Sequence, residues 1–256
     1  MKMFLISFVI AFALCLPTLA ELMDWALPRS ALLSIPATGL GYMLVFFHEI
    51  GHTAAFWIFG SPALPRFDFE HGGGYTHAAE RLWPILLAVW GAAFAAAIWL
   101  WRHMEYRWLI WLGIIMAAHT ALLMTQGHNV FIGFAGHGAE VLMGAFCLLR
   151  AFWNTTEKSH GVAERWLNMI FGCFAMIYSS IFTAGLIASD ISRDVYAGQK
   201  GGHLQGDLDR IAAMTGMTLP TIAGVLLVFN IAVFAYAIYM GIRHAPDRST
   251  RGTIDI

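Results

Sequence analysis

The chain has 256 residues, of which 59% are hydrophobic and 12% are charged. This composition holds too little polar material to cover a soluble globule of that length, so it predicts a polytopic membrane protein. The formal net charge of −1 and the absence of a basic run argue against a nucleic-acid-binding protein. The three cysteines stand in apolar runs without CxxC spacing and give no support to a disulfide framework or a thiolate zinc site.

The first apolar run, residues 3–20, follows Lys2 and ends with small residues near Ala20. The segment 1–20 therefore fits either a cleaved signal peptide or a first transmembrane helix. A cleaved leader and the distribution of Lys and Arg between the loops favour opposite orientations, so the orientation in the membrane stays open.

Six further segments are apolar enough for transmembrane helices, each of which needs about 20 apolar residues. They are residues 31–60, 82–101, 108–125, 130–149, 166–188 and 219–241. The first of them is long for one crossing, and its residues Pro36, Gly39, Gly41 and Gly51 predict a bend or an interruption. The sequence thus predicts an all-α polytopic membrane protein, with one membrane-embedded domain over residues 21–244 and a polar tail over 245–256.

Segment 31–60 carries the HExxH sequence His48-Glu49-Ile50-Gly51-His52, with no Lys or Arg within ten positions. Residues four apart lie on one face of a helix, so the two histidines can present nitrogens to one zinc ion while Glu49 acts as a base. Ionisable groups at membrane depth are costly and are usually retained for function. The alternative is a packed helix with two core histidines and a hydrogen-bonded glutamate.

Residues 66–77 predict a short β-hairpin after the motif helix, because polar and aromatic residues alternate there before three glycines. An exposed strand edge near a protease site suits the binding of an extended peptide by main-chain hydrogen bonds. An ordinary hairpin without a binding role is the alternative.

Ionisable residues recur around the segment 130–149. His137 and Glu140 are three positions apart and therefore share one helical face within this apolar run. His128 precedes the segment, and His119 lies in the span before it. Each of these histidines is either a satisfied core residue or a metal ligand.

The longest polar loop, residues 189–218, contains Asp207 directly before a predicted short helix over 208–215. Asp207 is either the N-cap of that helix or the third zinc ligand. Catalytic zinc commonly takes three protein ligands and leaves the fourth position to water. His137 and Glu140 compete with Asp207 for the third place.

These pieces together resemble the site-2 protease family of intramembrane zinc metalloproteases, and in particular its compact bacterial, M-fifty-B-like branch. Residues 73–76 are similar to a Gly-Gly-x-Thr strand of that branch. Residues 135–145 resemble its Ala-Gly-Tyr-Leu-Gly-Ser-x-x-x-Gly-Ala helix, and residues 207–220 resemble the entry to its final span.

The chain departs from the family pattern at three places. His137 stands where the family has tyrosine, Glu140 stands where a small residue is usual, and the Leu-Asp-Gly signature of the third zinc ligand is absent. The resemblance implies a Zn²⁺ ion held by His48 and His52, with Glu49 as the catalytic base. It does not carry over the third ligand, for which we expect Asp207 over His137 and Glu140, because Asp207 alone aligns with the family's acidic position.

The resemblance also implies hydrolysis of membrane-spanning or membrane-adjacent proteins within the lipid bilayer of the bacterial inner membrane. The alternative is a non-catalytic metal-binding membrane protein, either a metal sensor or a transport component. Glu49 favours the enzyme, because a transport site needs ligands but needs no base at this spacing.

Overall fold

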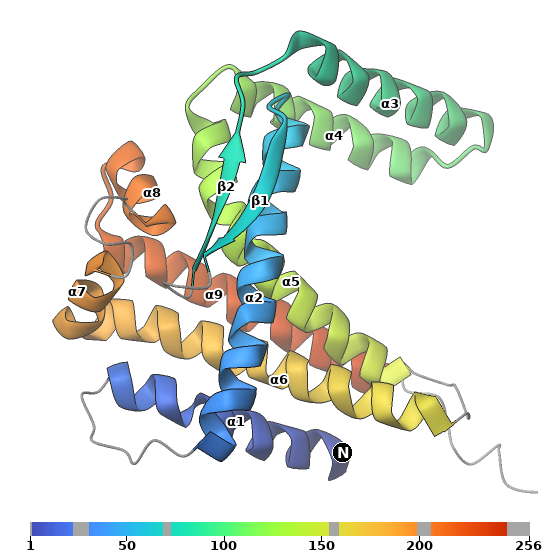
Figure 1. The fold of residues 1–256 in the computed structure, drawn as a ribbon. Coiled ribbons are helices and arrows are strands. Elements are labelled where there is room, and N and C mark those ends of the chain that lie inside the picture. Colours follow the sequence, from blue (N-terminus) through green and yellow to red (C-terminus); the bar gives the residue numbers. More distant parts are fainter. Residues whose placement is uncertain (1, 23–30, 69–72, 154–158, 199–205, 245–256) are drawn as a thin grey trace, which may run out of the picture. The chain divides into compact units, whose positions relative to one another are not determined.

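The computed structural model describes residues 2–22, 31–68, 73–153, 159–198 and 206–244. Within these ranges the chain forms helices and one two-stranded sheet (Figure 1). The helices are α1 (Lys2–Leu22), α2 (Ala31–Ile58), α3 (Trp83–Arg102), α4 (Tyr106–Leu123), α5 (Gly127–Trp153), α6 (Ser159–Ala188), α7 (Asp190–Gly198), α8 (Asp207–Thr215) and α9 (Leu219–Arg243). The strands are β1 (Ala63–Asp68) and β2 (Gly73–Ala78).

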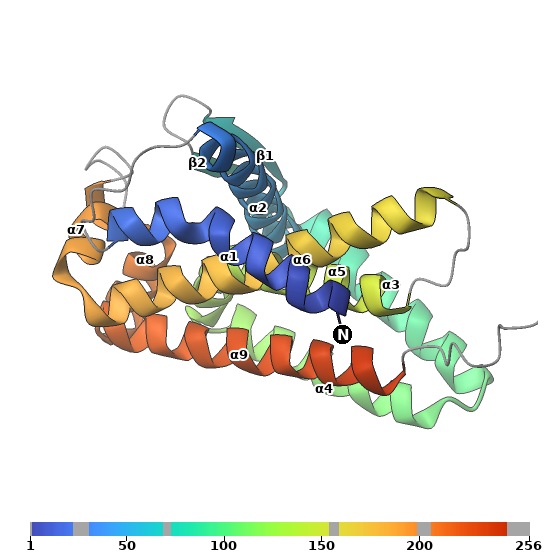
Figure 2. The same cartoon turned by 90° about the horizontal axis from the view of Figure 1, so that it is seen from below.

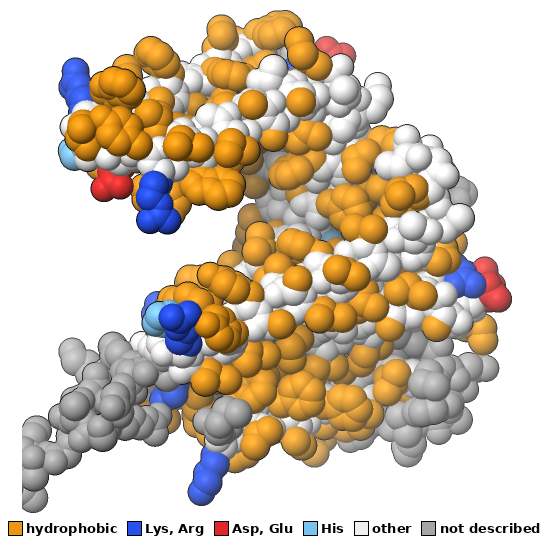
Figure 3. All heavy atoms as spheres, turned by 180° about the vertical axis from the view of Figure 1, so that it is seen from behind, with side chains coloured by type: hydrophobic (Ala, Val, Ile, Leu, Met, Phe, Trp, Pro, Cys, Tyr) orange, Lys and Arg blue, Asp and Glu red, His pale blue; other side chains and the backbone are white. Residues whose placement is uncertain are grey.

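Six helices of the described chain, namely α2, α3, α4, α5, α6 and α9, are long and apolar enough to cross a membrane. They coincide with the six predicted segments, and their ends differ from the predicted ends by at most four residues, except that α6 begins seven residues earlier than predicted. Hydrophobic side chains cover most of the visible face in Figure 3, and charged side chains are sparse there. Such a surface suits a lipid environment better than water.

Helix α2 runs without a break from Ala31 to Ile58, so the predicted interruption is wrong. Pro36 lies in the second turn, where the loss of one backbone hydrogen bond leaves the helix intact. Gly51 has a packing role instead. A Cβ atom at Gly51 would lie 2.2 Å from the carbonyl oxygen of Ala135, so glycine allows α5 to approach this turn of α2 closely.

The predicted β-hairpin is confirmed. Strands β1 and β2 pair antiparallel, with Ala63 opposite Ala78 at one end and Asp68 opposite Gly73 at the other. The hairpin lies along the C-terminal half of α2 (Figure 1). The residues 69–72 that connect the strands are outside the described residues. Strand β2 therefore lies beside the turn of α2 that carries the HExxH sequence.

The chain forms two compact units. The first unit comprises Met1–Gly41, Glu140–Arg193 and Ala223–Ile256. Its helix α1 packs beside α6 (Figure 2). Its interior is mainly apolar, and its buried polar groups include the Asn230 amide, which donates to the Ser179 hydroxyl at 2.9 Å, and the Thr183 hydroxyl, which donates to the Ser179 carbonyl at 2.8 Å. It serves as a packed helical scaffold.

The second unit comprises Tyr42–Ala139 and Asp194–Ile222. It holds the HExxH turns of α2, the hairpin, α3, α4, the first half of α5 and α8. His48, Glu49, His52, His137 and Asp207 all belong to this unit. The candidate site is therefore assembled within one compact unit.

Candidate metal centre

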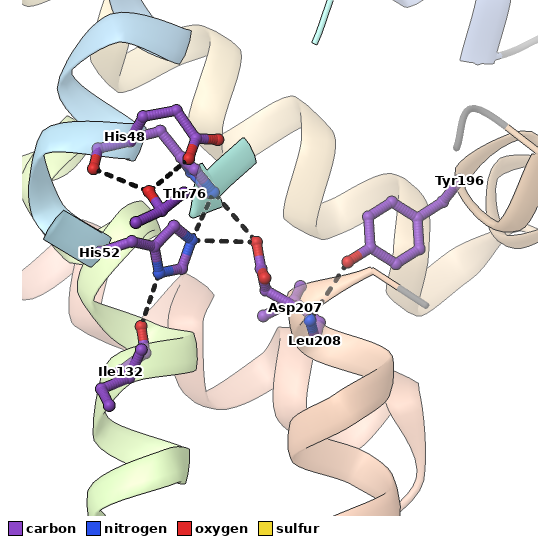
Figure 4. Close-up of polar contacts among 8 residues, drawn as sticks. His48, His52, Thr76, Ile132, Tyr196, Asp207 and Leu208 are labelled. Atoms are coloured by element: carbon purple, nitrogen blue, oxygen red, sulfur yellow. Dashed lines mark hydrogen bonds and ion pairs between the residues drawn. The ribbon is translucent and has the colours of Figure 1, made fainter. Parts of the chain in front are cut away.

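The side chains of His48, His52 and Asp207 converge on one point of the second unit (Figure 4). Asp207 Oδ2 lies 3.0 Å from His48 Nε2 and 3.1 Å from His52 Nε2, and the two nitrogens are 2.9 Å apart. Two ligands of one tetrahedral zinc ion are about 3.3 Å apart when the metal bonds are roughly 2.0–2.1 Å long. The triangle therefore needs only a small expansion to hold zinc.

The imidazole of His52 is oriented by the backbone of α5. His52 Nδ1 lies 2.7 Å from the carbonyl oxygen of Ile132, an acceptor, so Nδ1 carries the proton and donates it. The other nitrogen, Nε2, then has a free lone pair. In metal-bound histidines, a hydrogen bond from the ring nitrogen that does not bind the metal fixes the tautomer and raises the basicity of the ligating nitrogen.

This tautomer makes the triangle electrostatically incomplete without a cation. In neutral His52, the Nε2 lone pair faces the carboxylate oxygen of Asp207 at 3.1 Å, and both atoms are acceptors. Two acceptors at this distance repel each other unless a proton or a metal ion lies between them. The donor set of two imidazoles and one carboxylate is one that zinc accepts.

Gly136 provides the room for these nitrogens. A Cβ atom at this position would lie 2.5 Å from His52 Nε2 and 2.6 Å from His48 Nε2. Any larger residue on this turn of α5 would thus fill the space where the ligand atoms meet. Gly136 is part of the sequence motif at residues 135–145. The close packing of α5 on α2 is the reason why this position requires a glycine.

Asp207 reaches the histidines from the first turn of α8. The N-cap is Gly206, so the interpretation of Asp207 as the N-cap is wrong. Burial alone would raise the pKa of the Asp207 carboxyl, but the imidazoles of His48 and His52 beside it hold that pKa well below its usual range. Asp207 is therefore a carboxylate, as a metal ligand must be.

Two contacts hold α8 in place. The backbone N–H of Leu208 donates to the Tyr196 hydroxyl at 3.1 Å, and burial raises the pKa of that hydroxyl, so it stays protonated. Ile211 packs against Gly133 of α5, where a Cβ atom would lie 2.9 Å from the isoleucine side chain. These contacts position Asp207 although it is 159 residues from His48.

Glu49 is buried beside the triangle and is held by the hairpin. Its Oε2 accepts a hydrogen bond from the Thr76 hydroxyl at 2.7 Å, and the same hydroxyl lies 3.2 Å from the Glu49 carbonyl oxygen. A Cβ atom at Gly74 would lie 2.8 Å from Glu49 Oε1, so strand β2 covers the carboxylate closely. Glu49 therefore lies next to the candidate metal ligands but is not one of the three residues of their triangle.

His137 also lies at the site, but in another position. Its ring meets the His48 ring edge-on with the ring centroids 4.6 Å apart. Glu140 follows three residues later on α5, and both side chains are buried. His137 thus contacts a ligand of the triangle.

His119 and His128 make other bonds. His119 Nε2 donates to the Ile58 carbonyl at 3.1 Å and its ring stacks on Phe59, whereas His128 Nδ1 donates to the Thr125 carbonyl at 2.7 Å. Both histidines therefore bond backbone carbonyls at or next to helix ends.

A cavity of about 490 Å³ opens beside the triangle. Its walls come from α2, β2, α5 and α8, and they include Glu49, His52, Thr76 and Asp207. The remaining walls are mixed, with Phe56 among the apolar residues. A peptide segment and a water molecule fit a space of this size and polarity.

Comparison of the chain with family models, curated proteins and solved structures gives no match.

Three groups that hold the candidate site together were not among the predicted site residues. Thr76 was seen only as part of a strand motif, and neither the Ile132 carbonyl nor Tyr196 was considered. The signal for Thr76 was its place two residues after Gly74 on a short strand, because alternate residues of a strand point to the same side. A backbone carbonyl carries no signal in the sequence.

Proposed function

We propose that this protein is an intramembrane zinc metalloprotease that hydrolyses peptide bonds of membrane-spanning or membrane-adjacent proteins. One observation carries the proposal. The ligand atoms of His48, His52 and Asp207 converge, and Glu49, which is not one of them, is held by Thr76 at the edge of the same cavity. A site that only binds metal has no use for a separately oriented carboxylate.

The roles of the residues follow from this arrangement. His48, His52 and Asp207 would hold the zinc ion, which when bound supplies a Lewis acid that polarises a water molecule and the scissile carbonyl. Glu49 takes the proton of the attacking water. Its Oε2 is engaged by Thr76, so Oε1 is the atom available for this proton. Glu49 then gives the proton to the leaving amine nitrogen.

Strand β2 supports the binding of an extended substrate. One edge of β2 pairs with β1, and residues Gly74, Tyr75 and Thr76 also line the cavity. A peptide that lies along this wall is able to make main-chain hydrogen bonds while its scissile bond faces Glu49. Local unwinding of a transmembrane substrate would give it the extended form that this wall requires.

The six apolar helices support a membrane location, and the motif resemblance favours the bacterial inner membrane. The competing function is a metal sensor or a transport component, which needs the three ligands but has no need for Glu49.

The deciding experiment separates metal binding from cleavage. Purified protein should hold about one zinc ion per chain. Glu49→Gln should keep the zinc and lose cleavage of a panel of co-reconstituted single-span proteins, read by mass spectrometry, because it retains the shape of the base and removes its basicity. Glu80→Gln is the matched control, since Glu80 is exposed and does not line the cavity.

Two results would contradict the proposal. Cleavage by Glu49→Gln at the wild-type rate would remove Glu49 as the base. Zinc binding without cleavage of any panel member by the wild-type protein would favour the sensor or transport component.

A further inference from the structure

The cavity beside the metal centre has one cationic side chain that the mechanism does not use. Arg210 lines this cavity together with Glu49, His52 and Asp207, and no other Arg or Lys of the described chain does so. Arg210 lies on α8 three residues after Asp207, so both residues occupy one face of that short helix. The helix that supplies a metal ligand therefore also presents a guanidinium to the same space.

The guanidinium of Arg210 is available for a ligand. Within the part of the chain that the structure describes, it forms no ion pair and no hydrogen bond, and the side chain is exposed. The nearby carboxylates already have partners, because Asp207 bonds the histidines and Glu49 bonds Thr76. Asn129, another polar residue of the cavity wall, donates its amide to Gln126 at 2.7 Å.

The charge of the zinc-loaded site adds a second argument. The charged side chains that line the cavity are the carboxylates of Glu49 and Asp207 and the guanidinium of Arg210. A divalent ion at the triangle balances the two carboxylates, which leaves the positive charge of Arg210 uncompensated. Apolar wall residues, among them Phe56, Ile132 and Met214, lower the local screening of this charge.

The fixed position of α8 keeps Arg210 at a set place along the cavity. Leu208 is tied to Tyr196 and Ile211 packs on Gly133, so the helix between these anchors has little freedom to turn. Arginine is suited to binding a carboxylate at a set place, because its planar guanidinium donates to both carboxylate oxygens.

We propose that Arg210 is a specificity-determining residue that binds a carboxylate of the substrate close to the scissile bond. This inference rests on the proposed protease function and names its substrate class, which is peptides with an acidic group beside the cleaved bond. The carboxylate belongs either to an Asp or Glu side chain or to the C-terminus of the peptide. Both sources present the same chemistry to the guanidinium.

The test uses binding, so that it does not depend on turnover. The probes are tripeptide hydroxamates, which ligate zinc, with Glu, Gln or Lys placed at each position in turn, and each is made as the C-terminal acid and as the amide. Their dissociation constants for zinc-loaded protein in detergent are measured by isothermal titration calorimetry. The proteins are wild type, Arg210→Gln, Arg210→Glu and the control Arg107→Gln, whose exposed arginine at the start of α4 does not line the cavity.

We expect wild type and Arg107→Gln to bind one acidic probe about fivefold more tightly than its neutral counterpart, the upper range for a solvent-accessible ion pair. Arg210→Gln should lose this preference and keep its affinity for the neutral probe, and Arg210→Glu should prefer the Lys probe. A preference for the Glu side chain identifies an acidic residue as the source, and a preference for the acid over the amide identifies the C-terminus.

An equal preference in wild type and Arg210→Gln, or no preference in wild type, overturns the inference while the zinc site stands. Failure of every probe to bind zinc-loaded protein, acidic or neutral, is a different result. It contradicts the proposed metal centre and removes the inference with it.

Discussion

Two hollows of the second unit have comparable size and opposite chemistry. The cavity at α2, β2, α5 and α8 measures about 490 Å³, and a more open hollow along α3 and α4 measures about 620 Å³. The hollow is lined only by apolar residues, which are Ala96, Leu100, Trp108, Trp111, Leu112 and Ile115. The larger space is therefore lined by no ionisable side chain.

Volume therefore does not distinguish the candidate site from the apolar hollow in this protein. A wholly apolar hollow between two helices that pack side by side suits lipid chains, and its bulky exposed tryptophans are typical of a membrane protein (Figure 1). The smaller cavity brings ionisable groups together inside an apolar unit, and such groups persist where they have a function. Substitutions in the two regions should accordingly have different effects.

Removal of either histidine ligand should have the largest effect. His48→Ala or His52→Ala takes away one metal bond and leaves two facing acceptors, so we expect zinc affinity to fall by more than about 100-fold, beyond the range of indirect effects. Competition with a chromogenic chelator measures this affinity. His103→Ala, at the exposed end of α3, should keep full affinity. Equal zinc affinity in all three variants would refute the assignment.

Removal of Asp207 should have an effect of the same order, because it also leaves only two of the three candidate ligands. We expect Asp207→Ala to lose zinc more than about 100-fold, and His137→Ala and Glu140→Ala to lose no more than about 10–100-fold. The same chelator competition ranks the three variants. Full affinity in Asp207→Ala, together with a large loss in one of the other two, would move the third ligand to α5.

Gly136→Ala should weaken zinc binding without removing any ligand, because the added methyl group would meet both Nε2 atoms at 2.5 and 2.6 Å. Gly113→Ala on α4 is the matched control, since a Cβ atom there has nothing within 4 Å. The control should keep zinc and gain up to about 1 kcal/mol of helix stability. Zinc affinity and the thermal unfolding temperature are measured together. Unchanged affinity in Gly136→Ala would mean that α5 moves aside easily.

Thr76→Val should have the smallest effect and should act on the reaction alone. It removes the hydrogen bond to the Glu49 carboxylate, which is worth about 1.5 kcal/mol or roughly tenfold in rate. Zinc affinity should stay unchanged, and Thr76→Ser should restore the rate because it keeps the hydroxyl. A rate in Thr76→Val equal to that of wild type would show that Glu49 needs no positioning by β2.

The sequence predicted most of the helical fold because apolar runs report helix length directly. All six long segments became helices, and the predicted hairpin after the motif formed, with Gly73 and Gly74 at the start of its second strand. The short helix α8 began one residue earlier than predicted, and Gly216 at its end has the left-handed backbone that glycine favours. The exception was the interruption predicted at Pro36. Helix α2 continues through this residue, because only one backbone hydrogen bond near the N-terminal end of the helix is lost.

Within the site, the sequence determined what depends on neighbours along one helix. The spacing of His48 and His52 places both on one face of α2, with Glu49 beside them, whatever the rest of the chain does. The relative placement of these three side chains is thus a local property of five residues.

Tertiary structure decided which distant groups complete this face. The Asp207 carboxylate, the Thr76 hydroxyl and the Ile132 carbonyl reach the motif from three other elements. No periodicity links them to His48 and His52, because their distances depend on how closely helices and strands pack. Close approaches at small residues such as Gly136 set those distances, and only the folded chain reveals where they occur.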